Sequence, residues 1–356
     1  MIKIADSHIH CRFANYESIS KMLDDISTAG VTEACILSLP YRSAAENLAA
    51  LYAKMKYKKV NVRAFGGLHV TDRYCVIPPE IMAEKLLELG CDGIKLMFSP
   101  DLQRYYAKGL DDPYYDKMFS LLEERKTTVN IHLADPENFW DEGMKYHTGG
   151  FPTKEQMYSE AFRMLDRHPK LRVNFAHFMF LSNFPDEAKR VLEKYPNVCL
   201  DLTPGVEMYY NFDKQLEAWR DFFTKYSDRI LFGTDSNTIK TCNIQLEQLV
   251  YRKLSENRNT FVQNCYGKDF VIKGLALDDK VISKICYENY FERLGKSPAT
   301  VNTDKFYEYC ERILHDLEKE PYDEYYVKGG ELIPDLKKDP SQKIASDFCK
   351  FALANK

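Results

Sequence analysis

Two histidines separated by a single residue, His8 and His10, are the first side chains whose spacing suggests chemistry. They lie in the stretch Asp6-Ser7-His8-Ile9-His10, which closes a short apolar run. Residues i and i+2 of a β-strand point to the same face, so both imidazoles would converge on one point. Imidazole together with carboxylate suits zinc, manganese or iron. The pair alone is a weak signal, and it predicts part of a metal site only if further ligands share its position.

Three further polar residues each end a short apolar run, namely His132, His177 and Asp235. An aspartate that closes an apolar strand is costly to bury unless it is paired or bound to a metal. Each histidine taken singly is equally compatible with a structural core residue. The shared position of all these residues at the ends of apolar runs indicates instead that they meet on one rim.

Eight β-rich apolar runs recur with a spacing on the order of 30 residues, the length of one βα unit. They are Ile2–His8, Ala34–Pro40, Val62–His69, Gly93–Met97, Thr128–Ala134, Arg172–Phe178, Val198–Pro204 and Ile230–Asp235. Segments with helical periodicity lie between them, which implies a parallel sheet. An open, doubly wound sheet is the alternative, but it would favour a glycine-rich loop where His8 and His10 stand.

The fold class that we predict is α/β, a (β/α)8 TIM barrel with a C-terminal helical extension. We expect the barrel to span residues 1–296, and residues 297–356 to pack on it or to serve a subunit contact. Active sites of such barrels lie at the carboxyl ends of the strands. The rim on which the histidines and Asp235 are expected to meet is therefore the predicted active-site face.

Composition excludes several other classes of protein. The net charge is −4, and no block of Lys and Arg stands out, which argues against a nucleic-acid partner. The mean hydropathy is −0.44 and no long apolar run occurs, so we expect no membrane span. The ten cysteines form no CxxC pair and are expected to be buried free thiols. With no signal peptide expected before the first strand, these features predict a cytoplasmic protein.

The combined set of polar residues resembles the metal-site signature of the amidohydrolase superfamily. The closer resemblance is to the branch that contains aminocarboxymuconate semialdehyde decarboxylase and related decarboxylases and hydrolases. The set comprises His8-x-His10, Lys95, His132, His177 and Asp235. The segment Leu231–Ser236 is similar to the eighth strand of that branch, and Lys284–Gly295 looks like its closing helix. The resemblance covers about residues 1 to 296 and is specific to a superfamily, not to a reaction.

The resemblance implies one divalent metal, with Zn²⁺ expected first and Mn²⁺ second. Its implied ligands are His8, His10, His132 and Asp235. Asp235 would also accept a proton from metal-activated water, and His177 would act as an acid or electrophile. Lys95 has two possible roles. It could be carboxylated and bridge two metals, which would make His177 a ligand, or it could contact substrate and shape the electrostatics of the site.

Several other residues near the predicted rim are candidates for substrate binding. Two arginines could clamp a substrate carboxylate, a histidine ends the third run, and three residues lie on a long loop after the fifth run. They are Arg12, Arg42, His69, Trp140, Tyr146 and His147.

The leading functional prediction is a metal-dependent hydrolase of a small carboxylated or cyclic compound, such as a lactone or an amide. The alternative is a non-oxidative decarboxylase that uses the same metal site. A related phosphoesterase or nuclease is disfavoured, because those with a bridging glutamate on the fourth strand would lack Lys95. A barrel without activity is disfavoured because the ligand set is complete. The expected partner is a small-molecule substrate, with a homodimer as one possible assembly.

Overall fold

The structure is a computed structural model that describes residues 3–39, 45–68, 77–106, 108–319, 325–328, 331–334 and 340–356. Two of the predicted substrate contacts, Arg42 and His69, lie outside these described residues.

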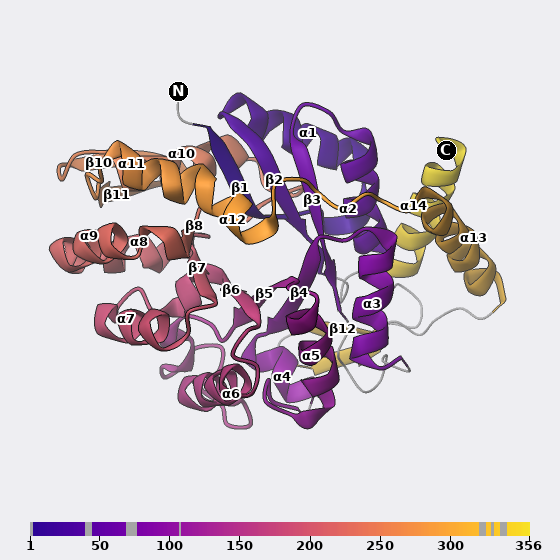
Figure 1. The fold of residues 1–356 in the computed structure, drawn as a ribbon, viewed down its shortest axis with the longest axis horizontal. Coiled ribbons are helices and arrows are strands. Elements are labelled where there is room, and N and C mark those ends of the chain that lie inside the picture. Colours follow the sequence, from indigo (N-terminus) through magenta and orange to yellow (C-terminus); the bar gives the residue numbers. More distant parts are fainter. Residues whose placement is uncertain are drawn as a thin grey trace.

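A ring of parallel strands forms the centre of the fold (Figure 1). In chain order the strands are β1 (Ile4–His10), β2 (Val31–Leu37), β3 (Asn61–Gly67), β4 (Gly93–Phe98), β5 (Thr128–Leu133), β6 (Arg172–Phe175), β7 (Val198–Asp201), β8 (Ile230–Leu231) and β9 (Ser236–Asn237). Each of β1 to β7 pairs in parallel with the next strand in sequence, and β7 pairs with β8. This arrangement confirms the predicted (β/α)8 fold.

The short strands β8 and β9 are the two ends of one interrupted eighth strand. β8 pairs with β7, whereas β9 pairs with β1 on the other side. Between them, Ser7 N donates to Phe232 O at 3.0 Å, and Asp235 N donates to His8 O at 2.9 Å. These bonds join the last strand to the first and close the barrel.

Helices surround the strands on the outside of the ring (Figure 1). They are α1 (Tyr16–Thr28), α2 (Ala45–Lys56), α3 (Pro79–Leu89), α4 (Pro100–Tyr106), α5 (Asp116–Glu124), α6 (Lys154–Arg167), α7 (Pro185–Lys194), α8 (Val206–Lys214), α9 (Leu216–Lys225) and α10 (Asn243–Ser255). The chain continues with α11 (Asp279–Ser283), α12 (Asn289–Leu294), α13 (Thr303–Lys319) and α14 (Pro340–Ala354). Helix α1 shows why they dock there: its buried residues recur at helical spacing and form one apolar face.

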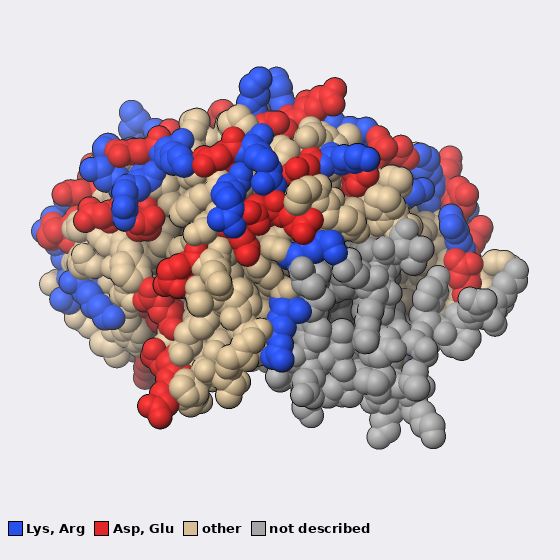
Figure 2. Space-filling view, turned by 90° about the horizontal axis from the view of Figure 1, so that it is seen from below, with Lys and Arg blue, Asp and Glu red and all other residues tan. Residues whose placement is uncertain are grey.

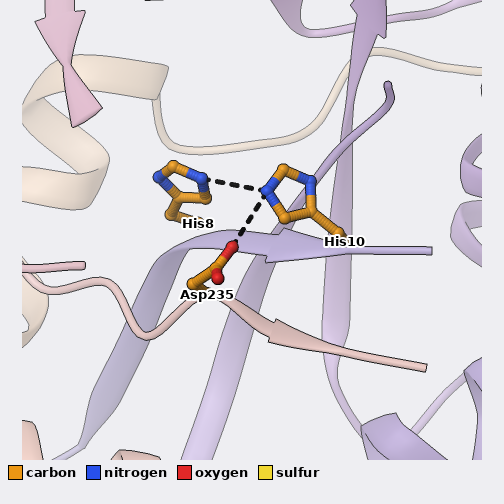
Figure 3. A group of neighbouring side chains, drawn as sticks. All are labelled: His8, His10 and Asp235. Carbon is orange, nitrogen blue, oxygen red and sulfur yellow. Dashed lines mark hydrogen bonds and ion pairs between the residues drawn. The ribbon is translucent and has the colours of Figure 1, made fainter. Parts of the chain in front are cut away.

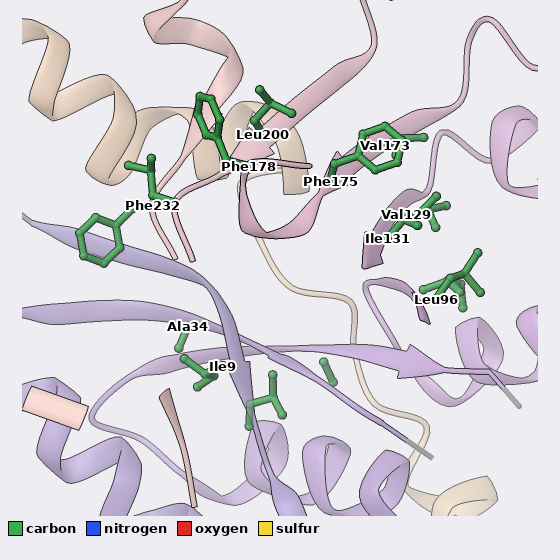
Figure 4. Packing of buried hydrophobic residues seen from close by; sticks show 14 of the residues in the cluster. Ile9, Ala34, Leu96, Val129, Ile131, Val173, Phe175, Phe178, Leu200 and Phe232 are labelled. Carbon is green, nitrogen blue, oxygen red and sulfur yellow. The ribbon is translucent and has the colours of Figure 1, made fainter. Parts of the chain in front are cut away.

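Both faces of the barrel strands are buried, and the alternation of side chains along each strand separates two cores. On β2, Ala34 and Ile36 belong to the large outer core, part of which Figure 4 shows. The intervening Cys35 and Leu37 belong to a small second cluster that also contains Tyr290 of α12. Burial on both faces explains why the strands read as continuous apolar runs in the sequence.

The amino end of the barrel is closed by α12. Thr128, the first residue of β5, donates from Oγ1 to Arg293 O at 3.0 Å, and Arg293 Nε donates to Asn174 Oδ1 at 2.7 Å. Asn289 Nδ2 donates to the carbonyl of Ile230 at 2.7 Å. Because these contacts lie at the starts of the strands, a site inside the barrel opens toward the carboxyl ends.

Two additions lie outside the βα repeat. Helices α13 and α14 of the C-terminal extension pack on α2, where Phe306 and Phe348 lie 6.2 and 6.0 Å from the ring of Tyr52. On the opposite side of Figure 1, strands β10 (Thr260–Cys265) and β11 (Lys268–Lys273) form an antiparallel hairpin beside α10. The sequence analysis did not predict this hairpin, which becomes important below.

The surface carries both signs of charge. On the face shown in Figure 2, basic and acidic side chains are interspersed along the upper part. Among the helices that the structure describes, none combines the length and the apolar character needed to span a bilayer.

Candidate metal centre

Three of the predicted ligands, His8, His10 and Asp235, converge at the mouth of the barrel (Figure 3). One ligand atom from each lies within 4.8 Å of the others. His8 Nε2 is 3.1 Å from His10 Nε2, which is in turn 3.1 Å from Asp235 Oδ1. Both histidines lie inside β1, which runs two residues beyond the predicted strand end at His8. The spacing argument holds, since both rings project to the same face.

The eighth strand brings Asp235 to this point through a close approach and a turn. A Cβ atom at Gly233 would lie 3.1 Å from the Cβ of His8 and 2.9 Å from Thr203 Oγ1, so a side chain there would push against β1. Asp235 itself has a φ of 56°, a left-handed conformation that aspartate tolerates better than most residues. This turn interrupts the strand and directs the carboxylate toward His10.

Partners on the far side of each ring fix the protonation of the two histidines. His8 Nδ1 lies 2.8 Å from Asp201 Oδ2, and His10 Nδ1 lies 2.6 Å from the carbonyl oxygen of Leu37. Both partners only accept hydrogen bonds, so each Nδ1 carries the proton and each Nε2 presents a lone pair. Burial lowers the pKa of His8 and lowers that of His10 to about 3, which keeps both rings neutral.

This donor set fits a divalent cation. Two Nε2 lone pairs facing each other at 3.1 Å repel unless a positive charge lies between them, and Asp235 adds a negative charge beside them. Neutral imidazole and carboxylate are ligands of zinc and manganese. The carboxylate and carbonyl that hold the Nδ1 atoms are the outer partners usual for ligating histidines.

The other two predicted histidines form an adjoining pair. The ring of His177 lies 5.5 Å from that of His8 and 4.8 Å from that of His132. The ring of His177 therefore lies between His132 and His8, one of the three converging ligands. His132 Nε2 is buried and lies 3.5 Å from Asp135 Oδ1, which is too far for a strong hydrogen bond. This nitrogen has no hydrogen-bond partner among the described residues. A buried nitrogen in this state is available to a ligand.

His177 stands on a left-handed turn and not, as predicted, at the end of a strand. β6 ends at Phe175, and four consecutive residues from His177 to Phe180 have φ between 51° and 54°. Such a conformation costs roughly 1–2 kcal/mol per residue. Packing holds the turn, because Phe178 lies 5.2 Å from Phe212 and 5.4 Å from Trp219, ring to ring. No residue pattern in this segment predicts the turn.

Side chains from two other elements also fix this turn. His177 N donates to Asp201 Oδ1 at 2.9 Å, and Lys154 Nζ on α6 donates to Phe180 O at 3.0 Å. His177 Nδ1 lies 3.3 Å from the carbonyl of Thr203. The ring is therefore held with Nε2 directed away from the backbone. Burial lowers the pKa of His177 well below its ordinary value.

Lys95 lies inside the barrel, at the start of a polar chain that crosses it. Its Nζ donates to Asn130 Oδ1 at 2.6 Å, and Asn130 Nδ2 lies 3.4 Å from Asp201 Oδ2, the same oxygen that holds His8. Burial lowers the pKa of Lys95 to about 8. Polar contacts through Asn130 and Asp201 thus connect Lys95 to His8 of the candidate metal centre.

Asp201 is a site residue that the sequence analysis missed. One of its oxygens holds the ring of His8, and the other accepts from His177 N. Burial would raise its pKa, but His8 and Thr203 outweigh burial, and the pKa lies below its ordinary value. Its signal, a carboxylate at the end of an apolar strand, is the one that identified Asp235.

The outer candidates fall into two groups. Arg12 follows β1, its carbonyl accepts from Thr238 Oγ1 at 2.7 Å, and its buried Nε has no hydrogen-bond partner in the part of the chain that the structure describes. On the loop after β5, the Tyr146 hydroxyl donates to Asp135, and the ring of Trp140 lies 5.0 Å from that of Tyr146. His147 is exposed on the same loop.

The sequence matches the amidohydrolase family over residues 42–289. The chain belongs to the amidohydrolase family. No curated protein sequence matches this amidohydrolase.

Solved structures with a similar fold include enzymes of known reaction. The 5-carboxyvanillate decarboxylase from Sphingomonas paucimobilis is 12% identical, with a TM-score of 0.52 over 83% of this chain and 99% of that one. The 2,6-dihydroxybenzoate decarboxylase from Rhizobium is 14% identical, with a TM-score of 0.53 over 83% and 99%. A 5-carboxyvanillate decarboxylase from Novosphingobium aromaticivorans, 13% identical, has a TM-score of 0.52 over 83% and 96%, and its structure contains manganese and a nitrobenzoic acid. At these identities the similarity establishes the fold alone.

Proposed function

We propose that this amidohydrolase is a metal-dependent, non-oxidative decarboxylase of a small hydroxylated aromatic carboxylic acid. The observation that carries the proposal is the convergence of two imidazole lone pairs and a carboxylate at the mouth of the barrel. Decarboxylation is preferred over hydrolysis, our leading prediction from sequence, because the similar solved structures named above include decarboxylases of such acids.

His8, His10 and Asp235 would hold the metal, with His132 of β5 as a fourth ligand from across the barrel. Zinc and manganese both suit these donors. When bound, the cation supplies a positive charge that orients an anionic substrate and stabilises the negative charge developing as the carbon–carbon bond breaks. The site residues then need only to orient the acid and to deliver one proton.

His177 is our candidate for the proton donor. When CO₂ leaves, the electron pair of the broken bond remains on the substrate carbon and takes a proton, which we assign to Nε2 of protonated His177. Burial lowers the pKa of His177, so the ring is mostly neutral at neutral pH, and the imidazolium that it forms by taking up a proton from solvent is a strong acid. Solvent then restores the proton. Arg12, whose buried Nε has no hydrogen-bond partner within the described ranges, is the candidate that anchors the substrate carboxylate.

The competing hydrolase uses the same ligands but breaks a C–O or C–N bond with water. It requires a group that takes a proton from that water, and Asp235 would be the group. The two reactions therefore differ in their products and not in their metal site.

The test is product analysis on metal-loaded protein. Purified protein is loaded with Mn²⁺ or Zn²⁺ and incubated with a panel of hydroxybenzoates and, separately, of lactones and amides. We expect CO₂ release from at least one acid, lost after treatment with a chelator and restored by metal. Hydrolysis of a lactone or amide without CO₂ release from any acid would overturn the decarboxylase in favour of the hydrolase.

A further inference from the structure

A lysine outside the predicted ligand set, Lys240, makes close contacts with Asp235. Its Nζ lies 2.8 Å from Asp235 Oδ2 and 2.7 Å from the carbonyl oxygen of the same residue. The third contact is with the hydroxyl oxygen of Tyr266, at 3.1 Å. An ammonium has three protons, so these three acceptors use all of them. The side chain of Lys240 is only 17% exposed.

The two oxygens of Asp235 consequently have different surroundings. Oδ1 faces His10 Nε2 at 3.1 Å, on the side where the ligands converge. Oδ2 faces Lys240 on the opposite side. The lysine therefore fixes the rotation of the carboxylate and directs one particular oxygen to the metal position.

The backbone that carries Lys240 is itself held in place. Asn243, the first residue of α10, donates from Nδ2 to the carbonyls of Asn237 and Lys240, each at 3.2 Å. Its Oδ1 accepts from Asn237 N at 3.1 Å. These bonds make the loop after the eighth strand a fixed support, so the position of Nζ does not depend on a freely moving segment.

Tyr266 reaches Lys240 from the tip of the β10–β11 hairpin. Tyr266 and Gly267 form the turn, with φ of 54° and 69°. These values are typical of two-residue turns that join the strands of a β-hairpin. The ring of Tyr266 also lies 5.2 Å from Lys240 Nζ, a cation–π distance. The hairpin is thus an addition to the barrel whose tip supports the metal centre.

We propose that Lys240, supported by Tyr266, is a positioning residue that makes Asp235 a dedicated metal ligand with one fixed oxygen toward the ion. The inference rests on the proposed metal site. It deepens the proposed function, because a carboxylate with one oxygen on the metal and the other on the ammonium of Lys240 is a weaker acceptor for a proton from water than a free carboxylate. A reaction that needs no such acceptor, such as decarboxylation, suits this arrangement.

The experiment compares Mn²⁺ affinity and the electron paramagnetic resonance spectrum of bound Mn²⁺ in wild type, Lys240→Met and Tyr266→Phe. Loss of an outer partner of a ligand costs about 10- to 100-fold in metal affinity. We expect a loss of that size and a changed spectrum for Lys240→Met, and a smaller loss in the same direction for Tyr266→Phe. The second variant changes one hydroxyl on a hairpin tip and remains informative if the first does not fold.

The control is Lys54→Met, which breaks another buried Lys–Asp pair, between Lys54 and Asp92, with Nζ 2.6 Å from Oδ2 at the amino end of β4. This variant is expected to lower thermal stability while leaving the Mn²⁺ affinity unchanged. Wild-type affinity and spectrum in both Lys240→Met and Tyr266→Phe would overturn the inference and leave the proposed function standing. Absence of Mn²⁺ and Zn²⁺ binding in wild type would instead overturn the proposed function, and this inference with it.

Discussion

The two sides of the candidate metal centre are held in different ways. On the paired side, which comprises His8, His10 and Asp235, every residue has a polar partner behind it. Those partners are Asp201, the carbonyl of Leu37, and Lys240. On the ring-packed side, which comprises His132 and His177, the rings contact each other at 4.8 Å. Phe180 covers both rings, at 5.6 and 5.3 Å.

This difference assigns a separate task to each side. The paired side orients its ligand atoms before any metal binds, because the hydrogen bonds are made to atoms that do not face the cation. The ring-packed side fixes the planes of its rings by packing and by a left-handed turn, and it leaves His132 Nε2 without a hydrogen bond among the described residues. We infer that the first side supplies three metal ligands, and that the second supplies His132 as the fourth ligand and His177 for the reacting substrate.

Removing the paired side should have the largest effect. The double variant His8→Ala plus His10→Ala deletes two of the three converging donors, so we expect loss of metal retention and of all metal-dependent activity. Metal content per chain after gel filtration is the measurement. His315→Ala, which removes an exposed histidine on α13, is the control and should retain the metal. A double variant that kept the wild-type metal content would rule out this centre.

Changing His177 on the ring-packed side should affect turnover and spare the metal. In His177→Asn the proton-carrying imidazole is lost, and the removal of a general acid typically lowers the rate by about 10²- to 10⁴-fold. We expect a loss of kcat in that range with unchanged metal content. Loss of metal together with activity would make His177 a ligand, which would favour the binuclear arrangement with a carboxylated Lys95.

The sequence predicted the barrel well because parallel strands buried on both faces must be apolar, and each of the eight runs overlaps a strand. It misplaced strand ends where local geometry decides them. β1 continues to His10 because its last residues pair with β9, and β6 stops at Phe175 because a left-handed turn follows. Four consecutive left-handed residues without a glycine have no recognisable sequence pattern, because tertiary packing offsets their conformational cost.

The metal centre was predictable only in part, for a related reason. Residues at strand ends, such as Asp235, can be placed from the order of the strands alone. Asp201 carried the same signal but was missed, and its two contacts depend on the interior geometry of the closed barrel. The contact between Lys240 and Tyr266 joins two loops, 26 positions apart, whose conformations no periodic pattern specifies.

The smallest effect that we predict concerns a buried acid pair beneath the paired side. The Thr234 hydroxyl lies between Asp6 and Glu247, and Asp6 Oδ1 accepts from His8 N at 2.9 Å. Burial raises the pKa of Asp6 to about 7, and burial together with Asp6 raises the pKa of Glu247 well above its ordinary value. Folded protein thus binds a proton at pH values where the unfolded chain, with an Asp pKa near 3.8, has lost it.

The sign of the resulting pH dependence follows from linkage. When the pKa of a group is higher in the folded protein than in the unfolded chain, the extra bound proton stabilises the fold. This contribution is complete at pH values below the pKa of the unfolded chain, and it is lost as the pH rises through the pKa of the folded protein. The melting temperature of metal-free wild type should therefore fall between pH 4 and pH 7 because of this pair. Glu247→Gln removes one of the two carboxyl groups, so the melting temperature of this variant should fall less over the same range. The difference in melting temperature between the variant and wild type should therefore rise with pH.

Thermal melts of the metal-free protein across this pH range test the idea, because a bound cation would add its own charge to the balance. Glu308→Gln is the control, since Glu308 is an exposed carboxylate on α13, far from the acid pair in the sequence, and should follow the wild-type curve. Parallel curves for Glu247→Gln and wild type would mean that the acid pair does not retain its proton. In that case a buried negative charge would lie beneath the paired side and would attract the cation. The arrangement of the paired side would then depend more on the metal than its hydrogen bonds suggest.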